Sequence, residues 1–243
     1  MYPPPSGPGY QGYPPPPPPR LRPVRGLAVF AIAALVCDSA IGLIAAGIDL
    51  WYAGLVDRIA ADVTAVPESE INTGDLVYGL SGILEFAVYV LVIVAFLVWL
   101  FRVRANAEIL SPGGHRRGKP WVFFGWLVPI IAFWFPKQIV DDIWYASARA
   151  GHAAAPPSKG LIDAWWAAWL VASLVSNLAG RILFSADDLD TIAAAARFDV
   201  VSIALLVVAA VLAIGVIRKI TDAQEQQRNP DLTPGVPTGY PAY

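Results

Sequence analysis

Five long apolar blocks constrain the fold of this chain more than any other feature of its sequence. They cover residues 27–50, 77–101, 121–135, 161–184 and 200–217. A helix needs about 20 mainly apolar residues to cross a hydrocarbon core of about 30 Å, because each residue adds about 1.5 Å along the helix axis. Four blocks reach this length, and the block at 121–135 does not. We therefore predict an all-α membrane protein with four transmembrane helices.

The distribution of positive charge predicts how these helices are oriented. Cytoplasmic loops of membrane proteins carry an excess of Lys and Arg. If the block at 121–135 does not span, 14 of the 17 basic residues lie on the same side as both termini. If this block spans, ten basic residues lie on one side of the membrane and seven on the other. We therefore predict four spans in the plasma membrane, with the N- and C-termini in the cytoplasm.

The block at 121–135 is rich in Trp and Phe and is interrupted by Pro129, with Pro136 directly after it. Trp favours the membrane–water interface, and proline breaks a helix because it lacks an amide hydrogen. We predict a proline-broken, re-entrant or interfacial helical segment over residues 121–149. Its second part has an apolar stripe that includes Ile139 and Ile143, which favours an interfacial helix. A kinked fifth span is the alternative.

Two proline-rich segments flank the membrane domain, which we place at residues 25–220. Residues 1–24 are rich in Pro, Gly and Tyr, and residues 221–243 end in a similar pattern. Such sequences bury too little apolar surface to fold. We predict disordered cytoplasmic tails, which are either simply solvated or bind membrane or cytoplasmic protein partners.

Ionisable residues inside the apolar blocks are the first candidates for function, because charge within a membrane is costly. Asp38 and Glu85 lie at similar depths in two successive spans, and Asn177 and Arg181 lie in the third. We predict that these four residues form an intramembrane polar cluster. The cluster is either a structural clamp between Glu85 and Arg181 or an acidic pair on a proton or cation path.

Three other residues within the blocks are given a structural interpretation. Asp49 and Asp163 lie near the ends of their blocks, so we expect both carboxylates to be solvated. Cys37 is expected to be a packed, buried thiol.

A second group of residues carries a resemblance to a known family. The second span ends in Trp99-Leu-Phe-Arg102-Val-Arg104-Ala-Asn106, and Gly-Trp126-Leu-Val-Pro129, Pro136-Lys-Gln and Trp144 follow. This pattern resembles the uncharacterised, mostly actinobacterial membrane family called domain of unknown function 4328. The resemblance implies a multi-span protein and brings no known activity. In one departure, residues 130–135 are entirely apolar, where the family often has a polar residue.

These motif residues are candidates for a cytoplasmic interface: Trp99, Arg102, Arg104, Asn106, Trp126, Pro129, Pro136 and Trp144. Arg102 and Arg104 follow the last apolar turn of their span, where each cationic side chain attracts anionic lipid by about 1 kcal/mol. They form either a headgroup or partner site or a simple membrane anchor. We expect Asn106 to cap the helix break at Pro129.

The sequence contains no motif for catalysis, a cofactor or a metal. One Cys and two His cannot form a four-ligand Cys/His zinc site, and there is no phosphate-binding loop or nucleophile elbow. The net charge of -2 does not favour nucleic acid. We expect a non-enzymatic scaffold or regulatory interaction module in the lipid bilayer. The alternative is a small transporter or channel that uses Asp38 and Glu85, as an oligomer because four spans enclose little volume.

Overall fold

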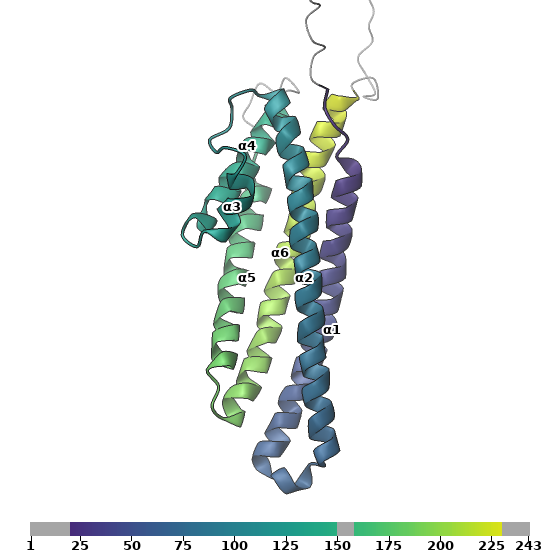
Figure 1. Cartoon of the computed structure of the whole chain (residues 1–243), viewed down its shortest axis with the longest axis vertical. Coiled ribbons are helices and arrows are strands. Elements are labelled where there is room, and N and C mark those ends of the chain that lie inside the picture. Colours follow the sequence, from purple (N-terminus) through teal and green to yellow (C-terminus); the bar gives the residue numbers. More distant parts are fainter. Residues whose placement is uncertain (1–19, 150–157, 230–243) are drawn as a thin grey trace, which may run out of the picture.

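The computed structural model describes residues 20–149 and 158–229, and every regular element in these ranges is helical. This confirms the predicted all-α fold. The α-helices are α1 (Arg25–Ala61), α2 (Glu68–Leu110), α3 (Trp121–Leu127), α4 (Phe135–Arg149), α5 (Gly160–Phe184) and α6 (Leu189–Arg228). Two short 3-10 turns, η1 (Val63–Ala65) and η2 (Ile131–Phe133), lie in the connections. Figure 1 shows these elements as an elongated bundle.

Four helices of the described chain, α1, α2, α5 and α6, are long and apolar enough to cross a membrane. This confirms the four predicted membrane-spanning helices. Helix α6 packs along both α1 and α5, and α1 packs along α2. The α1–α2 and α5–α6 connections lie at one end of the bundle, and the start of α1 and the end of α6 lie at the other (Figure 1).

The outward faces of these helices carry large apolar side chains. Ile44, Ile83, Leu174 and Val211 are each more than half exposed. Large exposed apolar patches mark surfaces that contact a membrane or another apolar surface. Lipid acyl chains provide such an environment. Cys37 also lies exposed on α1. The expectation of a packed, buried thiol is therefore wrong.

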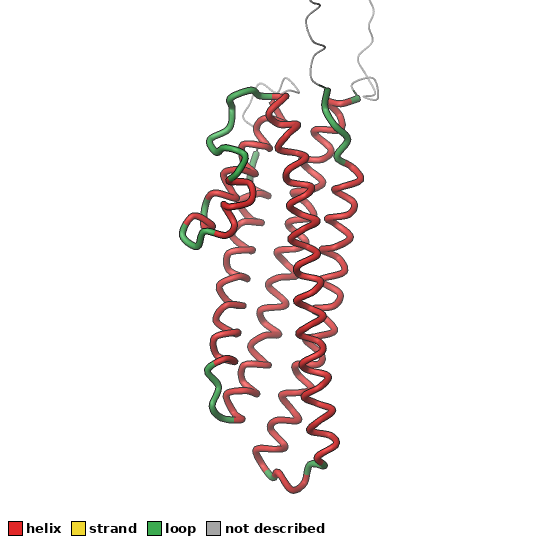
Figure 2. The backbone as a smooth tube through the Cα atoms, viewed as in Figure 1, coloured by secondary structure: helices red, strands yellow, loops and turns green. Residues whose placement is uncertain are grey.

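The proline-broken segment turns back instead of crossing the bundle. The axes of Trp121–Leu127 and Ile131–Ala148 are bent by 109° at the break. Both pieces lie beside the half of the bundle that contains the start of α1 and the end of α6 (Figure 2). A bend of this size is expected at proline, which removes a helix hydrogen bond. The structure thus contains the predicted broken helix in addition to the four long ones.

Helix α4 packs on the bundle through its apolar stripe. Ile139, Val140 and Ile143 are fully buried and join one core cluster with Trp99 and Ile220. The apolar stripe therefore faces the other helices. The acidic residues Asp141 and Asp142 of α4 are buried as well, and both form ion pairs that the sequence did not reveal.

The packing differs between the two ends of the bundle. The end with α3 and α4 holds the large core cluster, which includes Trp99, Leu100 and Ile143. Towards the other end, the second cluster contains only Ala53, Val56 and two alanines of α6. Among the described elements, α2 and α5 do not pack along each other. The space between these two helices is therefore where a site can form.

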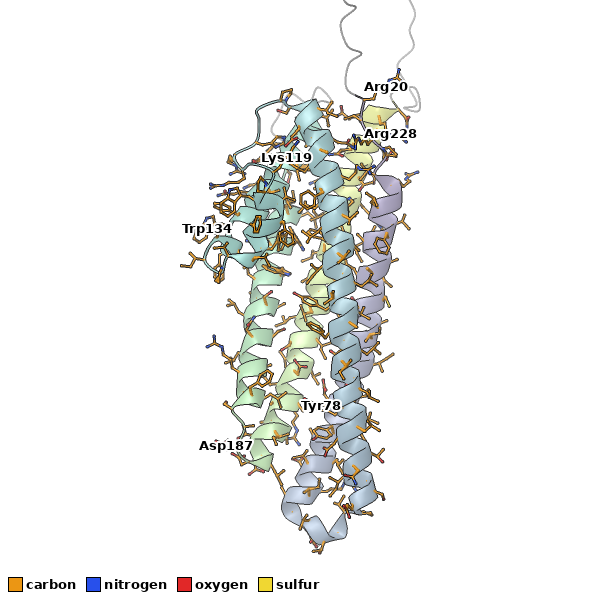
Figure 3. All side chains as sticks on the ribbon, viewed as in Figure 1. Arg20, Tyr78, Lys119, Trp134, Asp187 and Arg228 are labelled. Atoms are coloured by element: carbon orange, nitrogen blue, oxygen red, sulfur yellow. The ribbon has the colours of Figure 1, made fainter. Side chains whose placement is uncertain are left out.

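The last helix is longer than expected. Helix α6 continues to Arg228, so residues 221–228 are helical instead of part of a flexible tail. The predicted disorder of residues 1–19 and 230–243 lies outside the described residues. No membrane is part of the structure, so the cytoplasmic location of the termini stays a prediction from the charges. Figure 3 shows Arg20, Lys119 and Arg228 towards one end of the bundle and Asp187 towards the other.

Candidate functional site

A cleft in the membrane domain collects the intramembrane polar residues that the sequence singled out. It has a volume of about 540 Å³ and is lined by residues of α1, α2, α5 and α6. Asp38 comes from α1, Glu85 from α2, and Asn177 and Arg181 from α5. These four residues, which come from three helices, therefore share one cavity.

The predicted clamp between Glu85 and Arg181 is absent. No ion pair within 4.0 Å joins these two side chains, both of which belong to the described residues. Asn177 instead donates from Nδ2 to the carbonyl of Ser173, at 2.8 Å. Ser39, beside Asp38, donates to the carbonyl of Leu35 at 2.8 Å. The serine and asparagine side chains thus bind their own helices, and the carboxylates are left facing the cleft.

A third carboxylate, Asp199 of α6, lines the same cleft. The apolar block at 200–217 begins one residue after Asp199, so the block by itself does not include this carboxylate. Helix α6 begins earlier, at Leu189, so Asp199 lies within the helix. It shares a helical stripe with Ile203 and Leu206, which also line the cleft, and this i, i+4, i+7 spacing was the signal that could have revealed it.

The carboxylates of the cleft are close enough to influence one another. Glu85 interacts electrostatically with Asp38, Asp49 and Asp199. Such interactions are stronger in a partly buried site than in water, because the effective dielectric constant is lower. Asn177 and Arg181 face the same space, so three carboxylates and one guanidinium line the cleft. The charge balance favours a positively charged occupant.

Asp49 is buried, so the expectation that its carboxylate is solvated is wrong. Only 3% of its surface is exposed, and its Oδ2 atom has no hydrogen-bond partner among the described residues. Asp49 lies on α1 and interacts electrostatically with Asp199. Asp163, in contrast, is partly exposed, with 44% of its side chain accessible, and it pairs with Nζ of Lys137 at 2.7 Å.

An aromatic chamber of about 250 Å³ adjoins the acidic cleft. The two cavities share Asp38, Tyr89, Trp169 and Leu206. The chamber is otherwise mainly apolar and aromatic; its ring-bearing lining includes Phe96, Phe123, Trp126 and Trp165. Its walls therefore combine apolar surface with the faces and edges of aromatic rings, and one carboxylate, Asp38, lies where the two spaces meet.

Helix α3 closes one side of this chamber. Its residues Phe123, Trp126 and Leu127 line the cavity. The ring of Trp126 packs edge-on against Phe96 and Trp169, with centroids 5.7 Å and 5.4 Å apart. The Nε1 atom of Trp126 is buried without a partner in the described structure. The proline-broken segment is thus part of the site.

The second group of predicted residues lies at the end of the bundle where α1 begins. Trp99 is fully buried and donates from Nε1 to the hydroxyl of Thr221, at 3.1 Å. Asn106 donates from Nδ2 to Oε1 of Gln224 at 3.1 Å and to the carbonyl of Arg22 at 2.8 Å. The expectation that Asn106 caps the break at Pro129 is therefore wrong. It joins the segment before α1 to α2 and α6.

The two arginines of the motif also bind protein atoms. Arg104 is 3% exposed and donates to Oε1 of Glu108 and to the carbonyl of Arg117, at 3.2 Å and 2.7 Å. Arg102 donates to the carbonyl of Pro23 at 2.9 Å. Arg104 is thus too buried for a headgroup site, and the motif arginines hold neighbouring segments in place.

The remaining motif residues shape the proline-broken segment and its surroundings. Pro129 lies in the turn between α3 and η2, and Pro136 lies in the first turn of α4, where a missing amide hydrogen costs least. Trp144 donates from Nε1 to the carbonyl of Ser158 at 3.2 Å, and Nζ of Lys219 lies 4.2 Å from its ring centroid. These residues fix the position of α4 against α5 and α6.

A family model described as Domain of unknown function (DUF4328) matches residues 62–222. The match begins after α1 and includes α2 to α5 and most of α6. It therefore contains Glu85, Asn177 and Arg181 of the cleft, but not Asp38. No curated protein and no solved structure matches the chain.

Proposed function

We propose that this chain, which belongs to the DUF4328 family, binds an organic cation with an apolar part in the membrane domain, as the substrate site of a small transporter. The observation that carries the proposal is the convergence of Asp38, Glu85 and Asp199, from three different helices, on one cleft that adjoins an aromatic chamber.

The charge of the cleft supports a cationic ligand. Ionisable groups within a membrane commonly mark substrate or ion pathways, because their burial is costly unless a partner compensates for it. Asp38, Glu85 and Asp199 face the cleft, and Arg181 provides one positive charge. A bound cation would reduce the repulsion between the carboxylates, and an anion would increase the repulsion.

The aromatic chamber supports an apolar part on the ligand. Aromatic ring faces attract cations, and desolvation strengthens this attraction to about 2 kcal/mol or more. Trp169 and Tyr89 line both cavities, so they border the carboxylates and the apolar space together. The cleft volume of about 540 Å³ is in the range of small-molecule sites. A lone metal ion would leave most of this space unused.

The proposal is for binding and movement without catalysis. The polar side chains that line the cleft carry carboxylates, hydroxyls, one amide, one guanidinium and the indole of Trp169, and we assign no reaction to them. The other hypothesis, a scaffold or regulatory module, depends mainly on the tails. Those segments lie outside the described residues, so no specific structural observation favours it over the cleft.

Equilibrium dialysis of the purified protein in detergent tests the proposal, with radiolabelled tetraphenylphosphonium as the probe. This cation is permanently charged and carries four aromatic rings. We expect saturable binding, and we expect Asp38→Asn and Glu85→Gln each to weaken it several-fold. Glu68→Gln and Asp187→Asn are matched controls, because both residues are exposed and lie outside the cleft.

Tetraphenylborate provides the decisive comparison, because it has nearly the same shape and the opposite charge. The proposal requires the protein to prefer the cation and requires this preference to fall in the cleft variants. Equal binding of the two ions, or equal effects of the cleft and control substitutions, would contradict it. Circular dichroism and gel filtration of each variant separate loss of binding from loss of fold.

A further inference from the structure

A groove on the outer surface between α1 and α6 lies apart from the acidic cleft, near the start of α1. It has a volume of about 570 Å³, and most of its lining comes from apolar or small residues of α1. Arg25 at the start of α1 and Arg218, Thr221 and Asp222 of α6 complete the lining. The groove thus has a long apolar part and a short charged part.

The groove is long enough to follow an acyl chain through one leaflet of a bilayer. From Arg25 to Ala40, α1 rises by about 22 Å. A hydrocarbon core is about 30 Å thick, so the apolar part extends past the middle of the core when Arg25 lies at headgroup level. Ala28, Ala33 and Ala40 keep this stretch of α1 narrow, which leaves room for a chain of methylene groups.

The charged end of the groove is positive. Arg25 and Arg218 are both exposed, and within the described chain neither guanidinium forms an ion pair. The only carboxylate that lines the groove is Asp222, one helical turn after Arg218. The lining of the groove therefore carries two cationic groups and one anionic group, which suits a negatively charged lipid headgroup.

We propose that this groove is a specific site for an anionic phospholipid. The phosphate of the lipid lies between Arg25 and Arg218, and one acyl chain follows α1 towards Ala40. This site is distinct from the proposed cation site: none of its lining residues lines the acidic cleft or the aromatic chamber.

A second copy of the chain is the competing occupant, because a narrow row of alanines also allows close helix packing. A two-fold contact through this groove would bring the same surface of both copies together. The arginines at the charged end of one groove would then face those of the other. Because like charges repel, an anionic lipid suits the groove better than a second copy does.

Native mass spectrometry of the full chain in detergent tests the proposal. The probes are phosphatidylglycerol and phosphatidylcholine with identical acyl chains. We expect preferential retention of phosphatidylglycerol, and about thirtyfold weaker retention by Arg25→Gln/Arg218→Gln. That factor corresponds to about 1 kcal/mol for each cationic side chain.

Arg20→Gln/Arg22→Gln is the matched control, because it removes two positive charges near the same end of the bundle without changing the lining of the groove. We expect this variant to retain phosphatidylglycerol like the unmodified protein. If the Arg25/Arg218 double variant does not elute as a folded protein, the single variant Arg218→Gln is used. The expected loss is then about fivefold.

Cys37 gives an independent readout of the apolar part. It lines the groove and is the only cysteine of the chain. Phosphatidylglycerol should slow its alkylation by a maleimide, and inorganic phosphate should not. The proposal would be overturned if phosphatidylcholine protected Cys37 equally, or if the two double variants lost phosphatidylglycerol equally. It would also be overturned if protection appeared only when light scattering detects a dimer.

Discussion

The side chains of Asn106 on α2 and Gln224 on α6 form a buried hydrogen bond of 3.1 Å, from Nδ2 to Oε1. Both residues are 1% exposed. Asn106 also exchanges two hydrogen bonds with the main chain of Arg22, and Gln224 donates to Ser147 of α4 at 2.9 Å. One pair of amides thus connects the segment before α1 with α2, α4 and α6.

We predict that Asn106→Leu destabilises the membrane domain. The substitution leaves main-chain atoms of Arg22 and the Gln224 carbonyl without this partner, and each buried unsatisfied polar group costs about 1–3 kcal/mol. Thermal unfolding in detergent, followed by Trp fluorescence, should show a clearly lower midpoint. Asn72→Leu, at an exposed position of the same helix, is the control and should change the midpoint little. Similar midpoints for both variants would show that the amide pair contributes little.

We predict that the α4–α5 connection lies on the cytoplasmic side. A Ser158→Cys variant in a Cys37→Ser background places a single thiol at an exposed position of this connection. A membrane-impermeant maleimide should label it only after the cells are opened. Asp187→Cys, in the α5–α6 connection, should be labelled in intact cells. Labelling of Ser158→Cys in intact cells would rule out the four-span topology with cytoplasmic termini.

We predict that Trp126→Ala weakens the binding of tetraphenylphosphonium more than Trp134→Ala does. Trp126 lines the aromatic chamber, whereas Trp134 belongs to the same proline-broken segment but is 44% exposed and points away from the bundle (Figure 3). Loss of a stacking or cation–π contact in a desolvated site costs about 2 kcal/mol, which is about thirtyfold in affinity. If the two substitutions weakened binding equally in equilibrium dialysis, the aromatic chamber would not be part of the binding site.

We predict that His115 makes the fold less stable in mild acid. Burial lowers the pKa of His115 below its ordinary value of 6.5, and the nearby Arg104 lowers it further, against smaller opposing effects of the Ala107 carbonyl, Asp142 and Glu108. The unfolded chain therefore takes up a proton at this residue more readily than the folded chain. The contribution of neutral His115 to stability is present above about pH 6.5 and is lost as the pH falls through the lowered pKa.

The measurement is the difference in unfolding midpoint between pH 7.5 and pH 5 in detergent. His115→Gln should show a smaller difference than the unmodified protein, because glutamine does not titrate. Carboxylates that titrate in the same range affect both proteins equally and cancel in the comparison. An unchanged difference would mean that His115 is not responsible for the acid sensitivity.

The four long helices could be predicted from the sequence because their evidence is local. An apolar block of sufficient length must form a helix in lipid, where unpaired backbone groups have no water to bind. The bend in 121–149 could be predicted as well, because Pro129 cannot continue the hydrogen-bond pattern. In both cases the residues that decide the structure lie inside the element itself.

The helix ends and the polar partners could not be predicted in the same way. The apolar block at 200–217 did not indicate Asp199 as a helical residue, because the block is much shorter than α6. The partners of Asn106 lie 84 and 118 residues away in the sequence, and no local pattern indicates them. Asp38, Glu85, Asn177 and Arg181 were chosen for the cost of their burial, and the fold places all four on one cleft.

The 109° bend between α3 and the helix that follows has a mechanical consequence. The proline-broken segment occupies the space between α2 and α5 at one end of the bundle and does not extend to the other end. If a ligand passes from the cleft towards that end, only this short segment has to move. The four long helices, which make up most of the packed interior, can stay where they are.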